Sequence, residues 1–262
     1  MKRIYCLLTA IVLSTSLSAQ PFKKGDINED GDVTIADVTM LVDIILGKIN
    51  PEPSYADGII IDGYRCVYLG TSSGDLWATT NIGASSPEEA GDFFSWGETE
   101  GTNEGKQTFS WATYEWSGHT FDHLLKYCTE SARGTVDNLT EIDFEDDAAY
   151  NRWSRQWRIP TQKQMNELLT ECTWTWTTYN NVSGYEVKGP NGNAIFIPAA
   201  GVYDINGYRS DGETASLWTR SLVTSSCMNA YTLVGNQNEA PVITDIALRY
   251  CGRNIRPVAY IK

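Results

Sequence analysis

The sequence predicts an α+β fold, and three observations lead to that class. Short segments in which apolar and polar residues alternate, a pattern typical of strands, recur from residue 64 to the end of the chain. The pair Asn191-Gly192 stands between two such segments and predicts a tight β-hairpin. Two helical patterns, 145–153 and 161–172, interrupt the strands. Strands, then helices, then strands again, joined by long irregular segments, indicate the α+β class.

The first nineteen residues have the pattern of a secretory signal peptide. A basic start precedes an apolar run from Ile4 to Leu13, and small residues lead up to Ala19, after which we expect cleavage. The apolar run is too short to span a membrane. Cys6 lies too early for a lipid anchor. We therefore expect a secreted or cell-surface protein, with the periplasm as the alternative location.

An acidic loop follows the signal peptide. Counted from Asp26, it places oxygen-bearing side chains at positions 1, 3, 5, 7 and 12, with Gly31 at position 6 for the sharp turn. Calcium prefers six to eight oxygen ligands, and a twelve-residue loop supplies them at such positions. The pattern predicts a Ca²⁺ site formed by Asp26, Asn28, Asp30, Asp32 and Asp37, with Thr34 at position 9 acting through a water.

The stretch GDINEDGDVTIADVTMLVDIILGKI resembles a dockerin repeat, including the aspartate at position 12. The resemblance implies a docking module at 25–49 that binds a cohesin-like partner. Dockerins pair two such repeats, whereas this chain has one, and a module of this size cannot bury a core alone. The large domain, a second copy or a partner protein must therefore cover the apolar helix face, which comprises Ile35, Val38, Leu41, Val42, Ile45 and Leu46.

Residues 50–58 contain Pro51 and Pro53 without apolar periodicity, and this composition predicts a linker. The remainder, 59–262, reads as one domain. Its helix at 161–172 begins with a capping box, Thr161 followed by Gln164. The expected strands lie within 64–70, 76–83, the hairpin 184–201, 216–221, 229–235 and 254–261.

Three segments of this domain, 75–99, 157–176 and 249–258, resemble the Fibrobacter succinogenes major paralogous domain. The likeness extends over about 63–262. It implies a fold related to the formylglycine-generating (sulfatase-modifying) enzymes, a branch of the C-type lectin-like folds. The family has no settled activity, so the resemblance predicts a fold and a secreted role rather than a reaction.

No catalytic residue follows from the sequence. The enzyme relatives use two cysteines a few residues apart, whereas Cys227 and Cys251 are 24 positions apart in sequence. His119 and His123 lack the glutamate of an HExxH zinc motif, and the chain has no GxSxG serine motif. The acidic run 141–147 is interpreted as a solvated cap of the helix that follows it.

Five cysteines follow residue 19. An oxidising compartment permits disulfides, and an odd number leaves at least one thiol outside intrachain pairs. Their pairing stays open at this stage. They are Cys66, Cys128, Cys172, Cys227 and Cys251.

Lectin-like folds build their ligand surface from loops in the last third of the chain. The resemblance therefore implies a ligand surface there, to which we add Trp96, an aromatic in a loop-like segment. The expected residues are Trp96, Trp218, Arg220, Tyr231, Asn236, Arg249 and Tyr250. Trp111, Trp116 and Tyr208 are further loop aromatics that could bind sugars. Trp174 and Trp176 alternate on one strand face and are expected in the core.

These patterns predict a non-catalytic protein that binds a glycan or a protein outside the cell. The runner-up is an enzyme component of polysaccharide degradation, and a third reading is a self-assembling adhesion subunit. The formal charge of −13 argues against nucleic acid as a partner.

Overall fold

The computed structural model describes residues 32–45, 55, 57–209 and 212–259. The predicted signal peptide and most of the predicted linker lie outside these ranges. The chain divides into two compact units, 1–53 and 54–262, and this boundary falls within the predicted linker. Across the described ranges, no helix combines the length and the apolar character needed to cross a membrane.

The structure corrects the predicted fold class. The described part of the chain is 35% strand and only 13% helix, with several antiparallel sheets, so the fold is β-rich and the α+β, lectin-like expectation is wrong. The two expected helices are short: α2 (Ala148–Arg152) has 5 residues and α3 (Gln162–Glu171) has 10. Strand β12 (Glu239–Leu248) was missed because Pro241 and its polar neighbours weaken the alternating pattern.

The largest sheet joins the start of the large unit to the end of the chain. Its order is β1-β2-β3-β13-β4, so the last strand lies between strands far from it in sequence. The predicted strands at 64–70 and 76–83 are confirmed as β2 and β3. The five strands are β1 (Ile59–Ile61), β2 (Tyr64–Tyr68), β3 (Leu76–Ala78), β13 (Val258–Ala259) and β4 (Trp157–Arg158).

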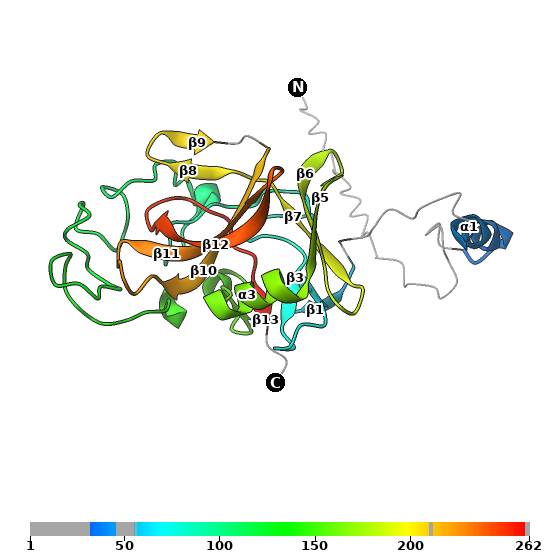
Figure 1. Ribbon diagram of the computed structural model, residues 1–262, viewed down its shortest axis with the longest axis horizontal. Helices are drawn as coiled ribbons and strands as arrows, with labels where there is room; N and C mark the ends of the chain where they lie inside the picture. Colours follow the sequence, from blue (N-terminus) through cyan, green and yellow to red (C-terminus); the bar gives the residue numbers. More distant parts are fainter. Residues whose placement is uncertain (1–31, 46–54, 56, 210–211, 260–262) are drawn as a thin grey trace, which may run out of the picture. The chain divides into compact units, whose positions relative to one another are not determined.

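Two three-stranded antiparallel sheets and a short hairpin complete the large unit (Figure 1). The predicted hairpin at Asn191-Gly192 is confirmed, with Gly192 at φ 89°, where the absence of a side chain removes the usual steric cost. The strands are β5 (Thr173–Tyr179), β6 (Val182–Lys188) and β7 (Ala194–Pro198); β10 (Thr214–Leu222), β11 (Asn229–Asn236) and β12; and β8 (Val202–Asp204) with β9 (Gly207–Arg209).

Helix α3 connects the two three-stranded sheets, since it contacts β5 and all three strands of the β10–β12 sheet (Figure 1). Its predicted capping box is confirmed. The Gln164 backbone N–H donates to the Thr161 hydroxyl at 3.1 Å, and the Thr161 N–H donates to the Gln164 side chain at 2.8 Å. Met165 and Leu168 of this helix lie in a buried cluster with Val187, Leu217 and others.

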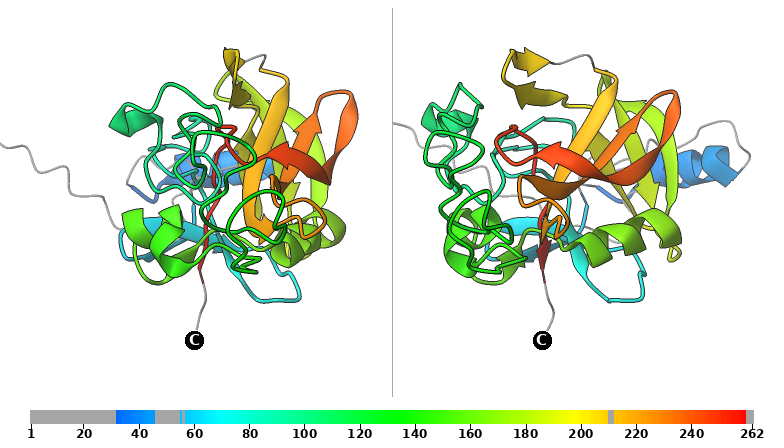
Figure 2. Two further views of the ribbon diagram at one scale, coloured as in Figure 1. Left: turned by 90° about the vertical axis from the view of Figure 1, so that its left-hand side faces the viewer. Right: turned by 60° about the vertical axis from the view of Figure 1, so that its left-hand side comes forward.

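A long irregular segment, 97–143, covers one side of the large unit and contains only the single 3₁₀ turn Thr102–Glu104 (Figure 2). The buried guanidinium of Arg249 holds it in place. Arg249 donates to the Tyr114 hydroxyl at 2.9 Å and to the carbonyl oxygens of Lys126 at 3.0 Å and Tyr127 at 3.0 Å. This buried side chain thus supplements the few isolated backbone bridges of the segment.

In the N-terminal unit, the described residues form one helix, α1 (Ile35–Ile45). Several apolar side chains on it are largely exposed. Ile35 is 78% exposed and Val38 53% exposed, whereas Asp37 is 1% exposed. The unit therefore buries an acidic side chain while leaving apolar ones in solvent.

Candidate functional site

Four of the predicted ligand-binding residues lie in the interior rather than on a surface. Trp96, Trp218 and Arg249 are at most 1% exposed and Tyr250 is 7% exposed. The Trp96 indole N–H donates to the Thr219 carbonyl at 2.8 Å, and that of Trp218 donates to the Phe94 carbonyl at 2.8 Å. These four side chains hold sheet and loop together, so the prediction of an exposed ligand surface is wrong for them.

The other three predicted residues are half-buried on separate parts of the β10–β11 hairpin. Arg220 pairs with Glu141 at 2.6 Å, which ties β10 to the long irregular segment. Tyr231 lies on β11, where its carbonyl accepts the Thr219 hydroxyl at 2.8 Å. Asn236 ends β11 and is the member of the set that lines a groove.

That groove has a volume of about 410 Å³ and lies between the end of α3, strand β5 and the β11–β12 turn. We call it the aromatic groove. Its walls combine indole and phenol rings with amide and carboxylate side chains. The lining residues are Leu169, Cys172, Trp174, Trp176, Tyr185, Asn236, Gln237, Asn238, Glu239, Ala240 and Pro241.

Two tryptophans form the aromatic wall. Trp174 and Trp176 point to one face of β5, and both are half-buried, so the expectation that they belong to the core is only partly met. Each packs edge-on against Tyr185, with ring centroids 5.4 Å and 4.9 Å apart. The Trp174 N–H donates to the Leu168 carbonyl at 3.0 Å, which fixes that ring against α3.

The polar wall is the β11–β12 turn, and the fold holds it rigidly. The Tyr185 hydroxyl lies 2.6 Å from the Asn236 carbonyl and 2.9 Å from the Glu239 carbonyl. Burial raises the pKa of Tyr185, so this hydroxyl stays protonated as a donor. The Asn236 side chain accepts the backbone N–H groups of Asn238 at 2.8 Å and Glu239 at 3.0 Å. Gln237, Asn238 and Glu239 are consequently displayed to solvent in a fixed arrangement.

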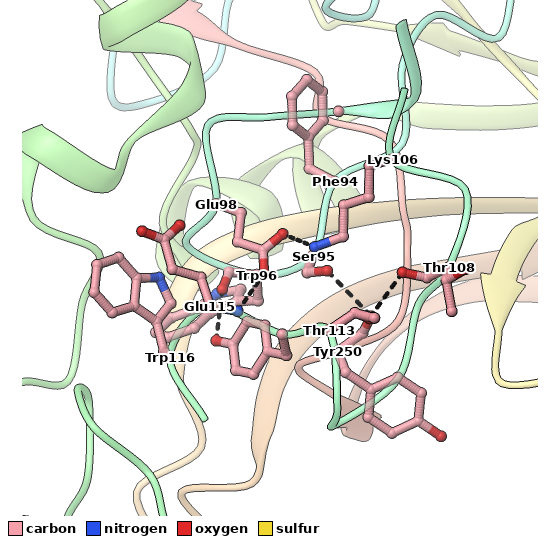
Figure 3. Close-up of polar contacts among 12 residues, drawn as sticks. Phe94, Ser95, Trp96, Glu98, Lys106, Thr108, Thr113, Glu115, Trp116 and Tyr250 are labelled. Carbon is pink, nitrogen blue, oxygen red and sulfur yellow. Dashed lines mark hydrogen bonds and ion pairs between the residues drawn. The ribbon is translucent and has the colours of Figure 1, made fainter. Parts of the chain in front are cut away.

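A second concavity, of about 540 Å³, is acidic and lies within the long irregular segment. In Figure 3 the Lys106 amine faces the carboxylate of Glu98, with which it pairs. The other Glu98 oxygen accepts the Glu115 backbone N–H at 2.8 Å. Burial lowers the pKa of Lys106 to about 8. Because both oxygens of Glu98 are used to close the loop, we interpret this cluster as structural.

Figure 3 also draws the polar contacts around the buried residues Trp96 and Tyr250. The Ser95 hydroxyl donates to the Tyr250 carbonyl at 3.2 Å, which joins the segment after β3 to the segment after β12. The Trp96 carbonyl accepts the Tyr114 hydroxyl at 2.7 Å. The half-buried Trp116 donates from its indole to the Gly97 carbonyl at 2.7 Å. The polar groups of these loop aromatics thus form hydrogen bonds with backbone carbonyls within the fold.

A third concavity, of about 510 Å³, lies between the β8–β9 hairpin and the β10–β12 sheet. Its walls are mainly aliphatic, with Arg209 and Arg253 as the cationic side chains. Arg253 lies over the Trp218 ring at 5.1 Å, and Arg209 pairs with Asp204 at 2.5 Å. Arg209 therefore has a carboxylate partner, and Arg253 also donates to the Ser216 hydroxyl, although its Nε has no hydrogen-bond partner among the described residues.

Of the predicted calcium ligands, Asp32 and Asp37 are described, and Asp26, Asn28 and Asp30 lie outside the described residues. Within the described ranges no three acidic, histidine or cysteine side chains gather as a metal site would require. The Asp37 carboxylate, in the first turn of α1, accepts the N–H of Thr34, the residue before the helix, at 2.6 Å. A buried carboxylate in that orientation fits the role of position 12 in a calcium loop.

Comparison of the chain with protein-family models, with curated proteins and with solved structures gives no match. The dockerin-like and paralogous-domain resemblances therefore remain predictions from the sequence.

Proposed function

We propose that this chain is a secreted or cell-surface protein that binds a glycan, and that the aromatic groove is its binding site. The observation that carries the proposal is the pairing of two half-exposed indoles, Trp174 and Trp176, with an exposed row of amide and carboxylate side chains across one groove. Both indoles pack against the buried core of the unit on one side and keep part of their surface open to the groove on the other.

The chemistry of the groove matches that of a sugar. A pyranose ring has an apolar face, which packs on a flat aromatic ring, and a rim of hydroxyls, which need donors and acceptors. Binding sites of this kind combine aromatic walls with a few well-placed polar groups. Tyr185 restricts both indoles and the turn, and this preorganisation lowers the entropic cost of binding.

The N-terminal unit enters the same proposal as a calcium-dependent docking module. Its support is the loop sequence from Asp26 to Asp37 and the buried carboxylate of Asp37. Calcium bound there would neutralise clustered carboxylates and fix the start of α1. The exposed side chains Ile35, Val38 and Leu41 would then meet a cohesin-like partner or a second copy.

The test is a glycan array probed with the full chain, followed by calorimetry on the best-bound glycan. Trp176→Ala removes one stacking face, and we expect affinity to fall by at least about tenfold, equivalent to about 1.4 kcal/mol. Tyr68→Ala is the matched control, because Tyr68 is an exposed aromatic on β2 that does not line the groove. Equal loss in both variants, or binding unchanged in Trp176→Ala, would refute the proposed site.

A further inference from the structure

We propose that Cys128 and Cys227 form an intrachain disulfide. Their sulfur atoms lie 3.6 Å apart, and both side chains are fully buried. The two residues are 99 positions apart in sequence. One belongs to the long irregular segment 97–143 and the other to the connection between β10 and β11, so the bond would join these two parts covalently.

The backbone on both sides of this sulfur pair is held by other groups. The Asp137 carboxylate accepts the N–H groups of Tyr127 at 2.7 Å and of Cys128 at 3.0 Å. The Glu130 carboxylate accepts the N–H of Cys227 at 2.8 Å. The fold therefore positions each cysteine independently of the sulfur contact, as a preformed disulfide site requires.

Arg249 fixes the distance between the two segments. One of its terminal nitrogens donates to the Tyr127 carbonyl at 3.0 Å and to the Cys227 carbonyl at 2.8 Å. The same nitrogen thus binds the residue before one cysteine and the other cysteine itself. A disulfide requires a sulfur–sulfur distance of about 2.05 Å, so the sulfurs must approach by about 1.5 Å, a movement within reach of side-chain rotation.

The oxidation is a thiol–disulfide exchange with an external disulfide such as oxidised glutathione. The first cysteine thiolate attacks the external disulfide, forms a mixed disulfide and releases one reduced thiol. The second cysteine loses its proton and attacks the protein-bound sulfur of the mixed disulfide, which releases the second thiol. Two protein thiols lose two electrons in total, and the external disulfide gains them as it becomes two thiols.

Burial governs when the bond forms. The pKa of Cys227 is raised to about 11, so little thiolate exists near neutral pH once the chain has folded. Both sulfurs are also closed to solvent. We therefore expect the disulfide to form during folding and to resist reduction afterwards.

The test is to refold the full chain in a glutathione buffer, block free thiols after denaturation and map linked peptides by mass spectrometry. We expect a peptide that contains Cys128 joined to Cys227. Cys128→Ala should lose this peptide and leave Cys227 alkylated. Cys66→Ala is the matched control, since Cys66 is equally buried in the same cluster, and it should keep the linkage.

A second measurement needs no variant and therefore does not depend on variant folding. Closing a loop of this length should raise the Tm of the oxidised wild type above that of the reduced protein by roughly 5–10 °C. Complete alkylation of Cys128 and Cys227 in folded protein recovered from the oxidising buffer would overturn the proposal. A linkage of either residue to Cys251 would overturn it as well.

Discussion

Two tryptophan-containing regions of the large unit differ in the exposure of their indole rings. Trp96 and Trp218 are each 1% exposed or less, and Arg249 and Arg253 stack on them at 5.0 Å and 5.1 Å. In the aromatic groove, Trp174 and Trp176 both pack edge-on against Tyr185 and keep part of their surface in solvent. The difference is whether other parts of the chain cover the rings. A covered ring contributes to the stability of the fold, whereas a partly exposed ring can contact a ligand.

The largest expected effect comes from the arginine that closes the first region. Arg249→Met removes the donors to four buried acceptors, three of them carbonyls, and leaves those carbonyls unsatisfied. We expect the free energy of unfolding to fall by more than about 4 kcal/mol, as measured by urea denaturation. The exposed Arg65→Met serves as the control and should lie within about 0.5 kcal/mol of wild type. A change below about 1 kcal/mol in Arg249→Met would show that the covering layer does not depend on this side chain.

A direct comparison of the two tryptophan sets is the next test. Trp218→Ala creates a cavity in a filled core and should lower the free energy of unfolding by about 3–5 kcal/mol. Trp176→Ala truncates a half-exposed ring, so its cost should stay below about 1.5 kcal/mol. Thermal and urea unfolding of the two variants side by side would measure this. Similar losses of unfolding free energy in both variants would contradict the distinction between the buried and the half-exposed tryptophans.

The pH dependence of stability provides a third test. Burial raises the pKa of Asp147 to about 6, although its carboxylate accepts backbone N–H groups from Ala149, Tyr150 and Ile159. The folded state therefore binds its proton more tightly than the unfolded state. This contribution to the free energy of unfolding is complete below about pH 4 and is lost as pH rises to about 6.

Asp147→Asn keeps an acceptor oxygen but does not titrate. We measure the free energy of unfolding of the wild type minus that of the variant. This difference should fall by about 1–3 kcal/mol between about pH 4 and pH 6 and stay level above that. Because the other titrating groups are common to both proteins, their effects cancel in this difference. A difference that stays level from about pH 4 to pH 7 would contradict the raised pKa.

The smallest expected effect concerns the N-terminal loop. Calcium should give a calorimetric binding signal with the wild type and a signal at least about tenfold weaker with Asp30→Ala. Chelating the calcium should change the affinity of the aromatic groove for its glycan by less than about twofold, because no groove residue belongs to the loop. Strong loss of glycan binding on chelation would show that the N-terminal unit, rather than the aromatic groove, binds the glycan.

Local chemistry made several elements predictable from the sequence. The capping box of α3 and the Asn191-Gly192 hairpin depend on residues adjacent in the chain, and both were confirmed. The strands β2 and β3 show clean alternation and were found for the same reason. By contrast, β12 contains Pro241, and β8 has 3 residues, so their local signals were too weak to show the β-rich class.

The candidate site was less predictable, because exposure depends on contacts between distant segments. Trp96 stands directly between Ser95 and Gly97 in sequence, yet it is fully buried and donates to Thr219, which lies 123 positions away. Trp176 alternates like a core residue, but it is only half-buried and lines the groove. The signal that indicates this site in the sequence is the run of amides 236–238 at the β11–β12 turn, of which Asn236 alone is among the predicted ligand-binding residues.

We expect the half-buried tryptophans Trp174 and Trp176, rather than the fully buried Trp96 and Trp218, to contact the ligand. The most direct measurement is a ¹⁵N–¹H NMR titration of the tryptophan indole signals with the glycan selected by the array, with assignments from single Trp→Phe variants. We predict that the signals of Trp176 and Trp174 shift as glycan is added, while those of Trp96 and Trp218 stay in place. Shifts at Trp96 or Trp218 with Trp176 unchanged would contradict the account.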